Sequence, residues 1–233
     1  MNIRPEITAL KDEIADYRRA MHQHPQTAYE ETFASDLVAQ KLAEWKIPHQ
    51  RGIAVTGIVA TIEGRKNNAA RSIGLRADMD ALDILEEQNK AWPSKIPGKM
   101  HGCGHDGHTA MLLGAAKYLN ETRNFDGVVH LIFQPAEEGQ KGAHRMIEEG
   151  LFRNFPCDRV FGMHNWPILP KGTIAMRTGP IMAASDVFRL KIIGKGSHAA
   201  QPHRGIDPIV IGSQIVTALQ SLVSREKSGI EPA

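Results

Sequence analysis

Short apolar segments of strand length alternate with helical patterns along most of the chain, and this alternation most constrains the fold. Three such segments, 72–78, 128–133 and 160–164, are largely apolar, and 53–62 is rich in β-branched residues. Helices are expected around them, over 7–21, 33–45, 107–119 and 140–149. Strands without a polar face are typical of parallel sheets that helices cover on both sides. The sequence therefore predicts an α/β fold with a mostly parallel sheet.

The pattern changes near residue 180, where we place a domain boundary. Phe188, Leu190 and Ile192 alternate with charged residues, which predicts a strand with one solvated face. A helix is expected next, with one apolar side formed by Ile211, Ile215, Ala218, Leu219 and Leu222. One strand and one helix are too little to close a core. We therefore predict one domain over 1–180 and the first part of an α+β domain over 181–233.

Charge and cysteine content exclude several classes of protein. The 28 basic and 26 acidic residues are mixed along the chain, whereas nucleic-acid binding proteins concentrate Lys and Arg, so nucleic acid is not an expected partner. The start of the chain lacks a secretory apolar segment, and no apolar run approaches the roughly 18 residues that span a bilayer. Cys103 and Cys157 alone form no disulfide framework. The sequence predicts a cytoplasmic protein that does not enter membranes.

Residues 101–108 read HGCGHDGH, which places one thiol and three imidazoles in a glycine-rich loop at the start of a helix. Glycine permits tight turns, so these side chains can converge on one point. Thiolate, imidazole and carboxylate together are the donor set of a divalent transition metal. A polar loop with chance histidines is the alternative interpretation, and it suits a lone histidine better than this cluster.

Further candidate ligands follow the ends of the apolar strands. They are Asp78 and Asp80 after 72–78, Glu137 and Glu138 after 128–133, and His164 at the end of 160–164. Adjacent carboxylates at the end of a buried strand repel each other unless a cation neutralises them, although a solvated acidic patch is an equal alternative for that pair alone. Sites in open α/β sheets form where the carboxyl ends of strands meet. The convergence predicts a metal site.

These motifs resemble the M20 peptidase family, in the amidohydrolase branch that contains hippurate hydrolases, indole-acetyl-amino-acid hydrolases and other N-acyl-amino-acid deacylases. The segments that carry the resemblance are, in chain order, His22–Pro25, Arg76–Leu82, Met100–Thr109, Gln134–Gly139, His164–Pro167 and Gly196–His203. The resemblance runs from about residue 15 to the end of the chain. It implies a zinc-exopeptidase-like catalytic domain and a lid domain through which two copies form a dimer.

The resemblance also implies a role for each matching residue. Two divalent ions, Mn²⁺ or Zn²⁺, would be held by four side chains, those of Cys103, His105, Glu138 and His164. Glu137 matches the general base, and Asp80 matches an acid that orients a ligand from outside the coordination shell. His198 matches a lid-domain histidine that reaches the substrate, often across a dimer. His22 and His24 match no ligand, and we interpret them as helix-end or packing residues.

The chain departs from the family pattern at three points. Asp83 stands where the family usually has proline, and Asp78 stands where related branches bind metal through histidine, which leaves the role of Asp78 open. The family's chain also continues beyond position 233, where it completes the lid, returns to the catalytic sheet and supplies one further histidine ligand. We therefore expect the 233-residue chain to be impaired and to hold fewer than two ions tightly.

The expected reaction is hydrolysis of the amide bond of an N-acyl amino acid. Metal ions would activate a water molecule and polarise the carbonyl, Glu137 would carry the proton to the leaving amine, and His198 would stabilise the oxyanion. A cysteine hydrolase using Cys103 and His105 is one alternative, but it leaves the adjacent glutamates unexplained. A non-catalytic metal-binding remnant is the other. The sequence does not determine the acyl group, the amino acid or the metal.

Overall fold

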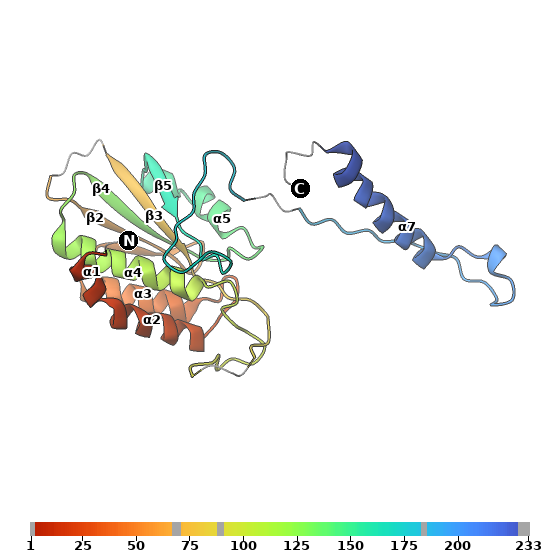
Figure 1. Cartoon of the computed structure of the whole chain (residues 1–233), viewed down its shortest axis with the longest axis horizontal. Coiled ribbons are helices and arrows are strands. Elements are labelled where there is room, and N and C mark those ends of the chain that lie inside the picture. Colours follow the sequence, from red (N-terminus) through yellow and green to blue (C-terminus); the bar gives the residue numbers. More distant parts are fainter. Residues whose placement is uncertain (1–2, 67–70, 88–90, 183–185, 228–233) are drawn as a thin grey trace. The chain divides into compact units, whose positions relative to one another are not determined.

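A five-stranded mixed sheet forms the centre of residues 1–170 (Figure 1). Its strands lie in the order β1-β2-β4-β3-β5, with the bounds β1 His49–Ile53, β2 Gly57–Glu63, β4 Val128–Gln134, β3 Ser72–Asp78 and β5 Arg159–Gly162. The last three are parallel, whereas β2 pairs antiparallel with both β1 and β4. The predicted α/β class is confirmed. β1 and β2 pair as an antiparallel hairpin because the β-branched segment 53–62 contains a tight turn and is not one continuous strand.

The computed structural model describes residues 3–66, 71–87, 91–182 and 186–227. Contacts divide the chain into two units, 1–170 and 171–233, and each unit is described by itself. Within the described residues, no helix is long and apolar enough to cross a membrane. The catalytic and lid roles assigned to 1–180 and 181–233 stay predictions.

Helices cover both faces of the sheet. One face packs against α2 (Lys11–Gln23), α3 (Thr32–Glu44) and α4 (His105–Thr122), preceded by the short α1 (Pro5–Ala9) (Figure 1). The other face packs against α5 (Gly142–Glu148) and α6 (Leu151–Asn154). Side chains alternate along each strand, so Ile58 and Ala60 of β2 face the first group and Val59 faces the second. This three-layer arrangement explains why the central strands are apolar on both faces.

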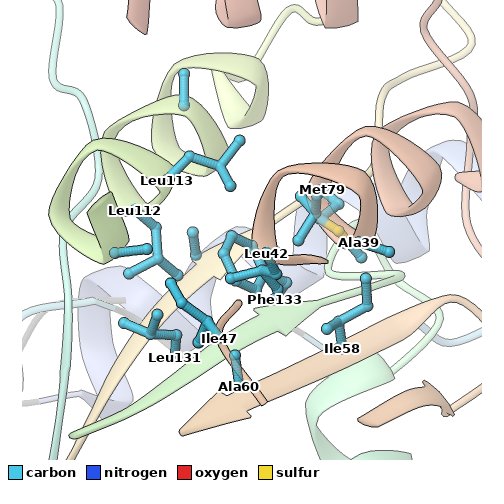
Figure 2. Close-up of a cluster of buried hydrophobic side chains, with 14 of the residues drawn as sticks. Ala39, Leu42, Ile47, Ile58, Ala60, Met79, Leu112, Leu113, Leu131 and Phe133 are labelled. Atoms are coloured by element: carbon cyan, nitrogen blue, oxygen red, sulfur yellow. The ribbon is translucent and has the colours of Figure 1, made fainter. Parts of the chain in front are cut away.

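The larger core lies between the sheet and helices α2, α3 and α4 (Figure 2). Phe133 of β4, Leu42 of α3 and Leu113 of α4 are fully buried in it. Figure 2 shows these side chains gathered between the helices and the strands. The apolar packing holds α4 against β3 and β4, and therefore sets where the first turn of α4 lies.

The register of the parallel strands brings their carboxyl ends to one edge of the sheet. Asp78, the last residue of β3, is the partner of Gln134, the last residue of β4. Gly162, the last residue of β5, is the partner of Arg76 in β3. The segments that follow these strands therefore leave the sheet side by side, as the convergence argument predicted.

The second unit contains the helix α7 (Pro208–Ser221), with a short 3-10 helix η1 (Pro202–Arg204) before it and a short π-helix η2 (Leu222–Glu226) after it. Asp207 caps α7, because its carboxylate accepts hydrogen bonds from the backbone N–H groups of Ile209 and Val210. The helix was predicted, but the strand predicted over 188–192 was wrong. Described residues 186–194 form no strand, because alternation of side chains makes a strand only where a second backbone pairs with it.

Candidate metal centre

Side chains from four segments converge at the carboxyl edge of the sheet. Three groups of donor atoms each lie within 4.8 Å of one another: Cys103, His105 and His164; Asp78, His105 and His108; and His105, Glu137 and Glu138. His105 belongs to all three groups. It is the first residue of α4 and follows Gly104, whose φ of 90° turns the chain into the helix in the left-handed conformation that glycine adopts freely.

The two ring nitrogens of His105 have different surroundings. Nδ1 lies 3.1 Å from Oδ1 of Asp80. Nε2 is buried and has no hydrogen-bond partner among the described residues, and the same holds for Oε1 of Glu138, 3.9 Å away. Metal–ligand bonds of about 2.0–2.3 Å place two donor atoms on one ion about 3–4 Å apart. Buried polar atoms are normally paired, so this orphaned pair fits a divalent cation.

His164 shows the same division of roles between its ring nitrogens. Its Nδ1 lies 2.7 Å from the carbonyl oxygen of Asn165, to which it donates, so that Nε2 carries the lone pair. Nε2 lies 3.2 Å from Sγ of Cys103. Histidines that ligate metals donate the other ring N–H to a carboxylate or a backbone carbonyl. His105 on Asp80 and His164 on Asn165 both follow this pattern.

Asp80 connects two of the predicted ligands. One carboxylate oxygen contacts Nδ1 of His105, and the other accepts the backbone N–H of Glu138 at 2.9 Å. Asp80 is buried, with 1% of its surface exposed. The orienting role that the family resemblance implies for Asp80 stays a prediction.

The acidic pair is directed by a buried glutamate that the sequence did not reveal. Oε1 of Glu31 accepts the backbone N–H of Ala136 at 2.8 Å, and Oε2 accepts the hydroxyl of Thr56 at 2.6 Å. Ala136 has a φ of 53°, and this left-handed turn sends the chain from β4 into Glu137 and Glu138. Glu31 immediately precedes α3, and acidic residues are common at the N-terminus of a helix because they interact favourably with its dipole. Nothing in the sequence distinguishes it from such a residue.

The clustered carboxylates at this edge of the sheet shift the pKa values of their neighbours in the direction that favours a nearby positive charge. Burial and the charge of Glu138 raise the pKa of Glu137 above its ordinary value. Burial and the nearby carboxylates of Glu138 and Glu137 raise the pKa of the Cys103 thiol to about 12. Burial acts to lower the pKa of His105, but the hydrogen bond to Asp80 and the charge of Asp78 outweigh it and raise that pKa. A bound cation would reverse these effects, because a metal ion deprotonates a coordinated thiol.

Asp78, whose role the sequence left open, makes two short contacts. Oδ1 lies 2.6 Å from Nδ1 of His108, and Oδ2 lies 2.6 Å from Nη1 of Arg76. Burial acts to raise the pKa of Asp78, but the hydrogen bond from His108 and the charge of Arg76 hold it well below its usual range. Arg76 also donates to the side chain of Gln134 at 2.8 Å, which ties the ends of β3 and β4 together.

His101, the first histidine of the HGCGHDGH loop, does not join these groups. It is buried, and burial lowers its pKa to about 4, so it is neutral at physiological pH. Its ring lies 6.2 Å from that of His22. His22 is buried as a packing residue would be, but it is also bound to Asp106 at 2.8 Å and Glu86 at 2.9 Å. His22 therefore joins α2 to the first turn of α4 through a polar network.

His198 belongs to the second unit, where it is exposed and accepts the backbone N–H of Ala200 at 3.2 Å. Its predicted contact with substrate stays a prediction. The other six predicted site residues lie at the carboxyl edge of the sheet: Asp80, Cys103, His105, Glu137, Glu138 and His164.

The family model of peptidase family M20/M25/M40 matches residues 74–233. The chain belongs to this family. It is 45% identical over 225 residues to the hippurate hydrolase of Campylobacter jejuni, covering 97% of this chain and 58% of that protein. It is 42% identical over 228 residues to the N-acetyl-L-cysteine deacetylase of Bacillus subtilis strain 168, and this match covers 97% of this chain and 54% of that protein. The predicted resemblance to the amidohydrolase branch is confirmed.

A solved structure supports the same assignment for this M20 chain. The Bacillus subtilis YXEP protein, described as a dinuclear metal binding peptidase from the M20 family, superposes with a TM-score of 0.74 at 36% identity. The match covers 92% of this chain and 57% of that one. The chain thus spans between half and three fifths of the length of these relatives.

Proposed function

We propose that the chain is part of a metal-dependent amidohydrolase that cleaves the amide bond of N-acyl amino acids. The observation that carries this proposal is the pair of buried, unpartnered donor atoms, Nε2 of His105 and Oε1 of Glu138, 3.9 Å apart. They lie beside a second carboxylate, that of Glu137, whose Oε2 is 3.9 Å from Nε2 of His105. The membership of family M20/M25/M40 gives the class of reaction.

We further propose that Cys103, His105, Glu138 and His164 are this chain's ligands in a site for two divalent ions. Two observations support this proposal. The donor atoms of these residues converge. Nδ1 of each histidine is hydrogen-bonded, to Asp80 for His105 and to the carbonyl of Asn165 for His164, which leaves Nε2 for a metal. Thiolate and imidazole suit Zn²⁺, whereas the carboxylates also suit Mn²⁺. When bound, the ions supply Lewis acidity toward the scissile carbonyl and an acidified water.

Glu137 is proposed as the general base. Its side chain is 41% exposed, compared with 27% for Glu138, so it is open to an incoming water. Its raised pKa, caused by burial and by Glu138, moves the carboxylate toward the range in which it can accept a proton and later release it to the leaving amine. Asp80 would hold His105 and the backbone of Glu138 in place during this transfer.

The proposed substrate class is the N-acylated amino acid, because both relatives carry such a compound in their names. His198 is proposed to contact the substrate, on the strength of the motif Gly196–His203, which lies within the matched family region. Exposed apolar side chains of the second unit, including Phe188 and Ile209, support a homodimer formed through that unit. Free thiols at Cys103 and Cys157 favour a reducing compartment, the cytoplasm.

A cysteine hydrolase is the second candidate, because Sγ of Cys103 lies 3.2 Å from a histidine nitrogen. That nitrogen belongs to His164 and not to His105, which the sequence had suggested as its base. The thiol's pKa of about 12 opposes this candidate, since a nucleophilic cysteine needs its thiolate form near neutral pH.

Amine release from hippurate and from N-acetyl-L-cysteine, measured with and without chelator, tests the proposal. We expect slow hydrolysis, as for an impaired enzyme, that is lost on chelation and restored by Mn²⁺ or Zn²⁺. It should be insensitive to iodoacetamide while metal is bound. Activity that survives chelation but is lost on alkylation would establish the cysteine mechanism. Bound metal without hydrolysis of any N-acyl amino acid would establish a non-catalytic binding protein.

A further inference from the structure

His108 lies one helical turn after His105, and their ring centroids are 5.5 Å apart. Its position makes it a candidate ligand, since its donor atoms group with those of Asp78 and His105. His108 is 2% exposed, so whatever its two nitrogens bind must lie within the protein or the metal site. The contacts of these nitrogens decide its role.

Both nitrogens of His108 are engaged by the protein itself. Nδ1 lies 2.6 Å from the carboxylate of Asp78, to which it donates. Nε2 accepts the backbone N–H of Asn165 at 3.0 Å. Nε2 must therefore carry a lone pair and Nδ1 must carry the proton, which makes His108 a neutral imidazole of one tautomer. A metal on Nε2 would displace the Asn165 amide, and a metal on Nδ1 would displace Asp78.

Asn165 directly follows His164 in a segment without regular secondary structure. Residues 163–167 belong to no helix or strand, and they are exposed. The Asn165 side chain fills the space beside Gly104, where an added Cβ would lie 2.2 Å from its Oδ1. The Asn165 carbonyl accepts Nδ1–H of His164. Asn165 thus touches His108, Gly104 and His164 at once. The rings of His108 and His164 also lie 4.6 Å apart, so His108 contacts His164 both directly and through the Asn165 backbone.

We propose that His108 is a positioning residue: it binds the Asn165 amide and so presents His164 to the metal centre, without being a ligand. Asp78 fixes the tautomer that this task requires, and Arg76 in turn holds Asp78. The inference rests on the metal site of the proposed function. It adds that a series of contacts from Arg76 through Asp78 and His108 orients His164, the most exposed of the proposed ligands. No helix or strand contains His164.

The tautomer can be tested without metal, by nitrogen-15 NMR of the histidine rings in the metal-free protein. We expect His108 to carry its proton on Nδ1, and to show no loss of the Nε2–amide contact when Zn²⁺ is added, whereas the ring signals of His105 and His164 move. A proton on Nε2, or a metal-induced shift of His108 equal to theirs, would overturn the inference.

Metal affinity in a double-mutant cycle provides the second test. Replacing a residue that orients a ligand costs about 10–100-fold in metal affinity. We expect His108→Asn to weaken Zn²⁺ binding by about that factor, because its amide reaches Asp78 but not Asn165. His108→Gln, whose amide oxygen can reach the Asn165 N–H, should retain more affinity. The exposed His144→Gln serves as the control for loss of a histidine.

The double variant His108→Asn/His164→Asn should bind Zn²⁺ no more weakly than His164→Asn, since an orienting contact has no effect once its ligand is gone. The inference would be overturned in favour of a ligand role for His108 by either of two results. One is that the losses of Zn²⁺ affinity from the two single variants multiply in the double variant. The other is that His108→Gln and His108→Asn lose equal Zn²⁺ affinity. Unchanged affinity in His108→Asn would show that it positions nothing. If the unsubstituted protein binds no metal, the proposed function fails, and the NMR measurement alone decides the tautomer.

Discussion

Two buried histidines in the same domain have opposite electrostatic surroundings. His130 lies within β4, where Nδ1 contacts the hydroxyl of Thr61 at 3.0 Å and the ring packs 5.5 Å from that of Phe155, and burial lowers its pKa. His105 lies at the carboxyl edge of the sheet, where Asp80 and Asp78 raise its pKa despite complete burial.

The comparison shows that the interior of the sheet and its carboxyl edge serve different purposes, stability in the interior and chemistry at the edge. The interior of the sheet accepts a polar side chain only in its neutral form, because burial penalises charge. The edge gathers Asp78, Asp80, Glu137 and Glu138 around one imidazole, an arrangement that repels itself unless a cation is present. Substitutions at the edge should therefore change metal binding and rate, and substitutions in the interior should change stability alone.

The largest effect is expected at the edge, from Glu137→Gln. In an enzyme extended to the full length of its relatives, it should keep bound metal but lose on the order of 10²–10⁴ or more in hydrolysis rate, because the general base is removed. The matched variant Glu138→Gln should lose both hydrolysis rate and bound metal. Atomic emission measures the metal content of each variant, and an assay of amine release measures its rate. Equal metal content in both variants, with activity lost only in Glu138→Gln, would reverse the two assignments.

The interior counterpart is Leu131→Ala in β4, at a fully buried position. It should lower the free energy of unfolding by about 2–5 kcal/mol through lost packing and a cavity. Urea unfolding in excess chelator measures this loss, and metal content of the folded variant should be unchanged. Val128→Ala, at the partly buried start of the same strand, is the control. If Leu131→Ala lowers the free energy of unfolding no more than Val128→Ala does, the placement of Leu131 in the core is contradicted.

The two cysteines provide a smaller contrast. Metal should slow alkylation of Cys103 by more than about tenfold, because a coordinated sulfur is not free to react. Cys157 contacts the carbonyl of Phe155 and should react at a rate that is independent of metal. Mass spectrometry of iodoacetamide-treated holo and apo protein separates the two sites. Equal rates at Cys103 in both forms would remove it from the ligand set.

The smallest effect is the pH dependence contributed by His130. Its folded pKa lies below the unfolded value of about 6.5, so the unfolded chain takes up a proton first as the pH falls. The contribution to stability is present above that pH and declines below it, toward the lowered folded pKa. His130→Gln should therefore flatten the stability profile between pH 7 and 5. An unchanged slope in urea unfolding would show that His130 does not titrate differently in the two states.

Much of the fold could be predicted because its signals are local. The bounds of β3 match the predicted segment 72–78, since a buried strand is apolar along its own length. The predicted strand at 188–192 failed because strand formation depends on a distant partner. Glu31 escaped notice for a related reason: its contacts, Ala136 and Thr56, are far away in the sequence.

The sequence by itself determined the donor types, their order along the chain and the strand ends from which they project. Only the tertiary structure decided which atom of each donor is free. His105 and His108 are neighbours on one helix face, yet His105 keeps an unpartnered Nε2 while both nitrogens of His108 are occupied. A ring nitrogen's availability depends on hydrogen-bond partners from distant segments, here Asp78 and Asn165, and spacing along the chain carries no information about them.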